Sequence, residues 1–229
     1  FLKLFLYSFS DSIIAISKKS KKSLEQLGIN KLKIRLIYNP FITKIIKNTN
    51  KNYSYGKSFN IISVGRLTKQ KNFSSLIDII SILQKKYPFI NLKIIGNGPD
   101  YNILNSKVKK NKKINIIQWK KNLHKHYKKS HLFILNSYYE GLPNILIEAI
   151  NNNVPSIATN CSGTMDILMN GKGGFIVPVG DKNAMINKIE YVIQNYKKSV
   201  FKTKISKKNI FRFNQQNCNK YYIHIKKYI

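Results

Sequence analysis

Cysteine, arginine and acidic side chains are scarce in this sequence of 229 residues, and long apolar runs are missing from it. The cysteines Cys161 and Cys218 are too few and too far apart for a disulfide framework, so a reducing compartment is the default. No run approaches the roughly 18 apolar residues that span a bilayer, and the start of the chain shows no signal-peptide cleavage pattern. The histidines have no metal-binding spacing, so no metal site is expected. Because the first residue is Phe1 instead of methionine, we expect a fragment of a longer chain.

The formal net charge is +32, from 41 basic and 9 acidic residues. Such a charge is typical of proteins that bind nucleic acid. However, 38 of the basic residues are lysines and 3 are arginines, whereas proteins that read phosphates or bases usually use the two-pronged arginine as well. Lysine, isoleucine and asparagine make up nearly half of the chain, and A/T-rich codons encode all of them. A biased genome therefore explains much of the charge, and we expect no specific nucleic-acid partner.

Hydrophobic residues make up 43% of the chain, which is enough for a packed core. From residue 59 onward, short apolar runs alternate with helical stretches, a pattern typical of parallel strands buried on both faces. The expected strands span residues 60–64, 91–95, 114–118, 132–136, 155–159 and 174–177. The expected helices span residues 73–87, 100–110, 123–129, 143–152, 164–170 and 183–196.

The pattern predicts an α/β fold with a doubly wound, Rossmann-like parallel sheet, plus a basic C-terminal helix over about residues 215–228. Ligands of such folds bind at the carboxyl ends of the strands. Ahead of this domain, residues 12–16 and 33–38 are predicted strands on either side of a lysine-rich helix. The expected division is a first segment (1–45), a polar linker (46–58), the α/β domain (59–196) and a basic tail with the C-terminal helix (197–229).

The segment 139–149 reads Tyr-Glu-Gly-Leu-Pro-Asn-Ile-Leu-Ile-Glu-Ala and holds two of the four glutamates, Glu140 and Glu148. Pro143 fits the first position of a helix, because its missing N–H would be unpaired there. The start of that helix offers backbone N–H groups and a partial positive charge, which suit a phosphate. Glu148 lies about five residues, or roughly 7.5 Å, further along the helix. A buried carboxylate there needs partners, which either ribose hydroxyls or a structural hydrogen-bond network would supply.

Two further turns follow predicted strands. Gly65-Arg66-Leu67 comes after the strand 60–64, and Lys71 opens the next helix, at the place where a phosphate would bind in this fold. A solvated loop with accidental cations explains the same residues. Gly96-Asn97-Gly98-Pro99 resembles half of a dinucleotide-binding fingerprint but lacks the third glycine, and a tight turn before a helix explains it as well.

Together these segments resemble the family 4 glycosyltransferases, retaining enzymes of the GT-B fold that use nucleotide sugars. The resemblance covers about residues 59–196, and residues 11–40 resemble the end of the family's first domain. The motifs occur in order, as Val64-Gly65-Arg66-Leu67 with Lys71-Asn72, Gly96-Asn97-Gly98-Pro99, Ser137-Tyr138-Tyr139-Glu140-Gly141-Leu142-Pro143-Asn144 with Glu148-Ala149, Pro155, and Gly173-Gly174-Phe175-Ile176-Val177-Pro178.

The resemblance implies that Glu140, Arg66 and Lys71 are catalytic. Arg66 and Lys71 would hold the donor diphosphate and stabilise it as it leaves, and Glu140 would face the donor sugar. Glu148 would bind the ribose hydroxyls. The other implied donor-binding residues are Gly65, Gly98, Gly141, Leu142, Pro143 and Asn144. Because the cations and the helix start supply the positive field, no metal or other cofactor is expected beside a UDP- or GDP-linked donor.

The sequence also departs from the family. A glycine common after the third strand is replaced near Gln118-Trp119, so the base contacts of the family are not carried over there. Asp166 stands where the family usually has glutamate. A GT-B enzyme has two Rossmann-like domains with the active site between them, and residues 1–45 would be only a remnant of the N-terminal acceptor domain. The missing part would be lost by truncation or supplied by a separate N-terminal domain.

The expected function is transfer of a hexose-type sugar, with retention, from a nucleotide sugar to a glycan or lipid-linked acceptor in polysaccharide biosynthesis. The expected location is the cytoplasm, either free or as a peripheral protein at the inner face of the membrane. One alternative is a non-catalytic remnant that only binds nucleotide sugars. The other is a basic module that binds RNA or an anionic membrane through its lysines and the aromatic-rich tail 201–228.

Overall fold

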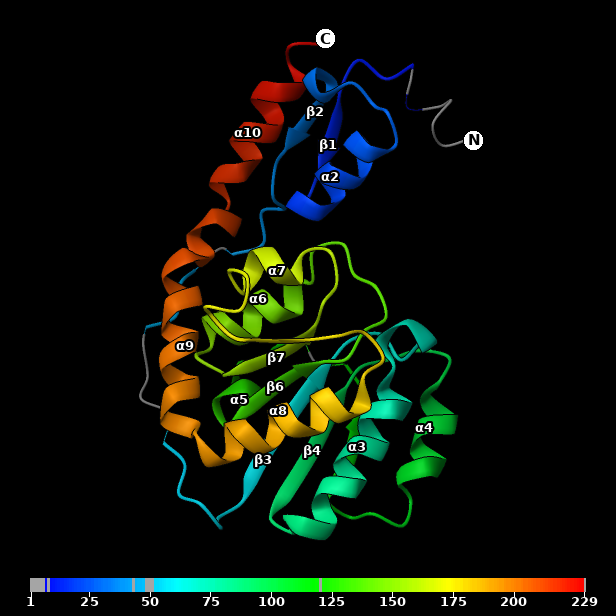
Figure 1. Ribbon diagram of the computed structural model, residues 1–229, viewed down its shortest axis with the longest axis vertical. Coiled ribbons are helices and arrows are strands. Elements are labelled where there is room, and N and C mark those ends of the chain that lie inside the picture. The colour runs from blue at the N-terminus through cyan, green and yellow to red at the C-terminus, as the bar shows by residue number, and fades with distance from the viewer. Residues whose placement is uncertain (1–6, 8, 43, 48–51, 120, 229) are drawn as a thin grey trace.

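A computed structural model describes residues 7, 9–42, 44–47, 52–119 and 121–228. The chain forms a large α/β domain and a small unit beyond one end of it, and the C-terminal helices run along both (Figure 1). The small unit contains β1 (Ile13–Ala15), α2 (Lys18–Gln26), η1 (Lys31–Lys33) and β2 (Ile34–Leu36). The α/β domain contains β3 (Phe59–Val64), η2 (Lys69–Lys71), α3 (Phe73–Lys86), β4 (Ile90–Ile95), α4 (Tyr101–Val108), β5 (Ile114–Ile117), α5 (His124–Lys128), β6 (Leu132–Leu135), α6 (Asn144–Asn151), β7 (Ser156–Thr159), α7 (Thr164–Ile167), β8 (Phe175–Val177) and α8 (Lys182–Gln194). The last elements are α9 (Tyr196–Asn209), η3 (Ile210–Phe213) and α10 (Gln216–Ile225).

The α/β domain is built on a six-stranded sheet with the order β5-β4-β3-β6-β7-β8. All of its strand pairs are parallel. The strand order reverses between β3 and β6, which defines a doubly wound fold with its switch point at that pair. Each of the predicted strands is present within a residue or so of its expected bounds. The prediction of a Rossmann-like parallel sheet is therefore confirmed.

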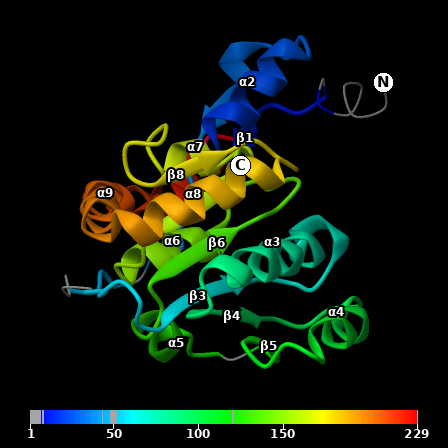
Figure 2. The same ribbon diagram turned by 60° about the horizontal axis from the view of Figure 1, so that its bottom comes forward.

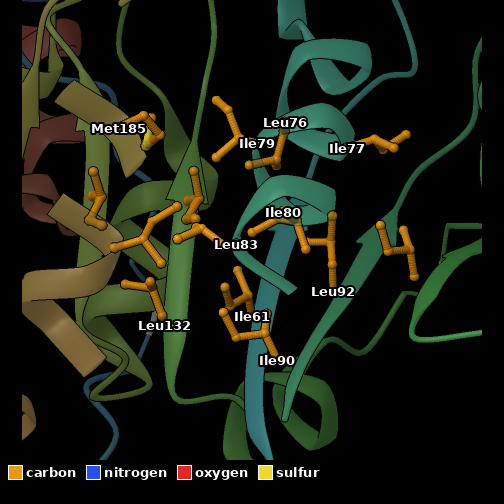
Figure 3. Close-up of a cluster of buried hydrophobic side chains, with 14 of the residues drawn as sticks. Ile61, Leu76, Ile77, Ile79, Ile80, Leu83, Ile90, Leu92, Leu132 and Met185 are labelled. Carbon is orange, nitrogen blue, oxygen red and sulfur yellow. The ribbon is translucent and has the colours of Figure 1, made fainter. Parts of the chain in front are cut away.

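Helices cover both faces of this sheet because successive strand residues point to opposite sides. Ile61 of β3 packs with α3, α4 and α8, and Figure 3 shows Ile80 and Leu83 of α3 beside it. The next residue, Ile62, packs with α5, α6 and α7 on the other face. This double burial explains why the strands read as continuous apolar runs. Among the helices in the described part of the chain, none is long and apolar enough to cross a membrane.

The small unit is a two-stranded parallel sheet of β1 and β2 with α2 beside it (Figures 1 and 2). The C-terminal helix α10 reaches back to this unit. The Tyr221 hydroxyl donates to the Ile37 carbonyl over 3.1 Å, and Ser12 Oγ lies 2.6 Å from His224 Nε2. The predicted basic helix at the C-terminus is thus present, and it packs against the small unit.

Helix α9 was not predicted, although it spans 14 residues. It packs against α6 and α8, and its buried side chains include Ser199, Thr203 and Ser206. Ser206 Oγ donates to the carbonyl oxygen of Gly173 over 2.9 Å. A helix that buries hydroxyl groups and small side chains has no apolar stripe for sequence analysis to detect.

Helix α6 begins at Asn144, one residue later than predicted. Pro143 is the residue before the helix and has extended backbone angles (φ −75°, ψ 96°), so its assignment to the first helical position is wrong by one residue.

Asn151, the last residue of α6, holds the start of the expected linker. Its Nδ2 donates to the Lys44 carbonyl over 2.9 Å, and its Oδ1 accepts from Ile46 N over 3.0 Å. Residues 48–51 of that linker lie outside the described residues. The division into four segments stays a prediction.

We predict that Gly173→Ala loosens α9. A Cβ atom at Gly173 would overlap the Cβ of Ser206, and overpacking of this kind costs about 1–3 kcal/mol. Thermal unfolding followed by circular dichroism measures the loss. The neighbour Lys172 supplies the control, because Lys172→Ala shortens an exposed side chain and adds no atom to the core. Equal melting temperatures for the Gly173 variant and the unmodified chain would contradict the assigned packing.

Candidate active site

The carboxyl ends of β3 and β6 meet at the switch point of the sheet, where the following loops diverge to opposite faces. The loop after β3 contains Gly65, Arg66 and η2, and the loop after β6 leads through Glu140 to α6. Backbone and side-chain hydrogen bonds tie the two loops together. Tyr138 N donates to the Gln70 carbonyl over 2.9 Å, and Gln70 Nε2 donates to the Tyr139 carbonyl over 2.7 Å.

An open cavity of about 720 Å³ lies between these two loops. It has one wall from the β3 loop and η2, and another from the β6 loop and the start of α6. Its lining residues are Gly65, Arg66, Thr68, Lys69, Gln70, Lys71, Trp119, Tyr139, Glu140, Leu142, Pro143, Asn144 and Ile145. The structure therefore brings together all three residues expected to be catalytic and four of the seven expected to bind the donor. Gly98, Gly141 and Glu148 are outside this lining.

Lys71 and Glu140 form an ion pair across the cavity wall. Lys71 Nζ lies 2.5 Å from Glu140 Oε1, and the Ser137 hydroxyl donates to the same oxygen over 2.6 Å. The two side chains are largely buried, with 14% and 9% of their surfaces exposed. Lys71 passes over Gly65, whose Cβ position would lie 3.1 Å from Lys71 Cε. A glycine at this position therefore leaves room for the lysine to reach the carboxylate.

The turn after β4 supports the loop that carries Arg66. Leu67 N donates to the Asn97 carbonyl over 2.8 Å, and a Cβ atom at Gly98 would overlap the Leu67 backbone. Asn97 Oδ1 also accepts from Trp119 N over 3.0 Å, which holds this residue at the cavity. Gly98 thus affects the cavity indirectly, because it allows the turn after β4 to touch the backbone of the loop after β3. Arg66 itself is exposed at the cavity surface.

The N-terminus of α6 supplies the polar end of the cavity. Asn144 is its first residue, and its buried side-chain oxygen has no hydrogen-bond partner among the described residues. Backbone N–H groups in the first turn of a helix also lack partners within the helix, and their dipoles favour an anion. Gly141 lies just before this point, and its carbonyl oxygen packs against Gly163. The loop is thereby fixed between α6 and the segment after β7.

Glu148 lies further along α6 and is half-buried. Burial raises the pKa of its carboxyl group. Burial, together with the nearby charge of Glu148, also raises the pKa of Tyr127 well above its usual value. The Glu148 carboxylate is thus in an environment that disfavours its charge, as expected for a group that lacks a cation in the described part of the chain.

A second cavity of about 620 Å³ lies on the other side of Glu140, between the small unit and the α/β domain. The two cavities share Tyr139 and Glu140. Lys19 and Ser20 of α2 line the second cavity, opposite Cys161 and its neighbours after β7. Glu140 therefore stands between two spaces, and the described residues of the small unit line the second of them.

Hydrogen bonds hold the small unit at this position. Ser17 Oγ lies 2.7 Å from Ser162 Oγ, and Lys18 N donates to Asp166 Oδ2 over 2.7 Å. Asp166, which the sequence marks as a departure from the family, thus accepts from the first residue of α2. The shorter side chain of an aspartate is long enough here, because the Lys18 N–H lies close to α7.

Several residues that line the cavity or support its lining are not singled out by the sequence. Gln70 joins the two loops and Ser137 orients Glu140, but neither polar type stands out in a hydrophilic loop. The family pattern marks Trp119 only as a departure, although Trp119 is the single tryptophan of the chain and an aromatic residue after a strand is a usable signal. Tyr139 lies beside Glu140 in the motif and lines both cavities.

The sequence of residues 44–208 matches the family described as Glycosyl transferases group 1. The chain belongs to this family. An uncharacterized glycosyltransferase of Methanocaldococcus jannaschii is 34% identical over 176 residues, which are 72% of this chain and 43% of that protein. The capsular polysaccharide biosynthesis glycosyltransferase CapM of Staphylococcus aureus is 31% identical over 172 residues, with 73% and 44% of the chains covered. The chain thus spans less than half the length of these two relatives.

A more distant relative of this group 1 glycosyltransferase chain has a more specific name. The UDP-Gal:alpha-D-GlcNAc-diphosphoundecaprenol alpha-1,3-galactosyltransferase of Escherichia coli is 27% identical over 202 residues, which are 81% of this chain and 52% of that protein. Among solved structures, Anabaena HepE in complex with UDP and glucose superimposes with a TM-score of 0.82 at 17% identity. That superposition covers 100% of this chain and 66% of HepE, and it shows the shared GT-B fold.

We predict that Glu148→Gln makes the chain more stable at neutral pH. Because burial raises the carboxyl pKa above its unfolded value, the folded chain binds the proton more tightly than the unfolded chain does. Ionisation of Glu148 therefore lowers the free energy of unfolding as pH rises through the window between the two pKa values. The substitution with glutamine removes this loss at pH 7. Below pH ~4, where the glutamate is protonated in the unfolded chain as well, it should change the free energy of unfolding little. Urea unfolding at both pH values measures the difference, and a variant that is less stable at pH 7 would contradict it.

Proposed function

We propose that this chain is the donor-binding half of a glycosyltransferase that takes a sugar from a UDP- or GDP-linked donor. The observation that carries the proposal is the single cavity that joins Arg66, Lys71, Glu140 and the start of α6. Cations and unpaired backbone N–H groups on facing walls suit a diphosphate. Asn144 lies in the same lining, and its buried side-chain oxygen, which has no partner in the described part of the chain, could accept a hydrogen bond from a hydroxyl or N–H group of the ligand.

In this proposal the donor diphosphate lies between Arg66 and the N-terminus of α6. The bond between the anomeric carbon and the diphosphate oxygen breaks. The oxygen of an acceptor hydroxyl bonds to that carbon on the same face of the sugar, and its proton passes to the leaving diphosphate, so that the configuration is retained. Lys71 and Arg66 stabilise the charge that develops on the leaving diphosphate. Glu140, held by Lys71 and Ser137, faces the sugar at the point where the two cavities meet.

Glu148 would reach the ribose hydroxyls from α6, which gives its half-buried carboxylate the partners that the described chain does not supply. Ionisation of the half-buried Glu148 carboxyl group lowers the stability of the fold. A role in ligand binding explains why such a residue is present, whereas a purely structural role does not. Gly141 and Gly98 would act indirectly, because Gly98 supports the Arg66 loop and Gly141 leads into α6.

The acceptor would enter through the second cavity, which the small unit lines together with Tyr139 and Glu140. The relatives named for capsular polysaccharide and for a diphosphoundecaprenol acceptor support a glycan or lipid-linked acceptor. Such an acceptor fits the expected place in the cytoplasm or at the inner membrane face. A separate N-terminal domain beside β1 and β2 would complete the acceptor side.

We predict that the full chain binds UDP or GDP sugars and that this binding depends on the cavity cations. Arg66→Ala should weaken binding at least about tenfold, because a charged hydrogen-bond partner of a phosphate contributes roughly 1.5–3 kcal/mol. Isothermal titration calorimetry with UDP, GDP, UDP-glucose and GDP-glucose measures the affinities. Lys85→Ala is the matched control, since Lys85 is an exposed cation on α3 outside the cavity.

Two further variants separate a binding role from a folding role. Lys71→Met together with Glu140→Gln removes both charges of the buried pair, so that no ion is left without a partner. Glu148→Gln should weaken donor binding although it stabilises the fold. A folded chain that binds no nucleotide sugar, or that binds equally well after Arg66→Ala and Glu148→Gln, would contradict the proposal.

We also predict that donor binding does not depend on a divalent cation, because Arg66, Lys71 and the α6 N-terminus supply the positive field. Titration with UDP in the presence of EDTA should give the same affinity, within about twofold, as titration with Mg²⁺ present. A large loss of affinity in EDTA would show that a metal carries part of the diphosphate charge. The Arg66→Ala chain serves as the reference for a weakened site in the same buffer.

A further inference from the structure

A groove of about 390 Å³ lies on the α/β domain between the segment 44–47 and α9. Of the described residues that line it, four are lysines and two are isoleucines. They are Ile45, Ile46, Lys47, Lys204, Lys207 and Lys208. Helix α9 runs along the opposite side of the domain from α4 (Figures 1 and 2), and none of these residues lines either of the two cavities beside Glu140.

Lys207 distinguishes this groove from an ordinary lysine-rich surface. Only 7% of Lys207 is exposed, and its ammonium donates to Asn153 Oδ1 over 2.6 Å. No carboxylate in the described part of the chain forms an ion pair with it. Burial lowers the pKa of Lys207 to about 8. Buried charges in proteins are normally paired, so the amine lacks the anion that its position calls for.

The segment that forms the other wall is held in place. Asn153 Nδ2 donates to the Lys47 carbonyl over 3.2 Å, so a single amide joins Lys207 on α9 to Lys47 on the segment 44–47. Lys204 and Lys208 are one turn of α9 apart and lie on the same face of the helix. The groove is therefore a fixed, positively charged site that suits an anionic group.

Apolar side chains continue the groove outward. Ile45 is 50% exposed and Phe201 is 65% exposed. Phe201 precedes Lys204 by three residues and Lys208 by seven, so these side chains share one face of α9. Exposed aromatic side chains beside lysines are characteristic of surfaces that lie at a membrane interface. A free phosphate would use the lysines but leave the apolar residues without a role.

We propose that this groove and the adjoining face of α9 bind the phosphate headgroup of an anionic lipid at a membrane surface. Lys207 would contact the phosphate inside the groove, Lys204 and Lys208 would flank it, and Phe201 would enter the interface. Such docking would place the donor domain beside a bilayer through residues that are separate from the donor cavity. The inference goes beyond donor binding and does not depend on it.

The test measures binding of the full chain to vesicles of phosphatidylcholine with and without phosphatidylglycerol. Binding should require phosphatidylglycerol and should weaken with added salt. Lys204→Gln with Lys208→Gln should lower the affinity roughly tenfold or more, since each lysine near an anionic surface contributes about 1 kcal/mol. The control is Lys109→Gln with Lys110→Gln, which removes the same charge from exposed positions after α4 and should change the affinity less than about threefold.

Two more substitutions test the groove and the apolar face separately. Lys207→Met keeps the length of the buried side chain and should reduce vesicle binding without loss of the folded state, checked by circular dichroism. Phe201→Ser should reduce it as well, whereas Ile103→Ser, at an equally exposed position on α4, should not. UDP titration of each variant shows that the donor site is intact, so that failure here and failure of the proposed function are distinguishable.

Equal losses in the two lysine pairs would overturn the proposal, because net charge alone would then explain vesicle binding. Stabilisation by inorganic phosphate or diphosphate that Lys207→Met abolishes, without any vesicle binding, would also overturn it and assign a free anion to the groove. Binding of RNA with the same dependence on Lys204 and Lys208, in the absence of vesicle binding, would assign the surface to nucleic acid instead.

Discussion

The parallel pairing of β3 with β6 is the constraint on which the rest of the structure depends. It sets Ile61 beside Leu132 and Ile62 beside Phe133, although about 70 residues of the chain separate the two strands. Because the connections run to opposite faces of the sheet from this pair, the loops that follow the strands leave a space between them. Every candidate catalytic residue stands on one of those two loops.

The Lys71–Glu140 ion pair is a direct consequence of this strand pairing. Alone, a buried ion pair is weak support for stability, because the loss of hydration offsets much of the attraction. Here it lies beside an open cavity, where a negatively charged ligand would compete with Glu140 for the lysine. The hydrogen bond from Ser137 to Glu140 would still hold the carboxylate if such a ligand drew Lys71 away. The arrangement therefore suits a site that is ordered without a ligand and can exchange one anion for another.

Sequence reasoning was strongest where one physical rule decides the outcome. The strands are apolar throughout because helices cover both sheet faces, so their positions, the parallel sheet and the cavity edge could all be predicted. It failed at α9, because that helix buries Ser199, Thr203 and Ser206 and has no apolar stripe. Gln70 was missed for a similar reason, since its role depends on a partner loop about 70 residues away. Such contacts have no local pattern.

Because lysine is so common in this chain, the presence of a lysine does not by itself mark a binding site. With 41 basic and 9 acidic residues, most cations must lie on the surface without a carboxylate partner, so the presence of a lysine says little. Burial is more informative, because an amine leaves water only where something compensates it. Lys71 is compensated by Glu140, whereas Lys207 has only an amide oxygen within the described structure. One buried lysine thus marks a site that the fold completes by itself, and the other marks a site that an outside anion would complete.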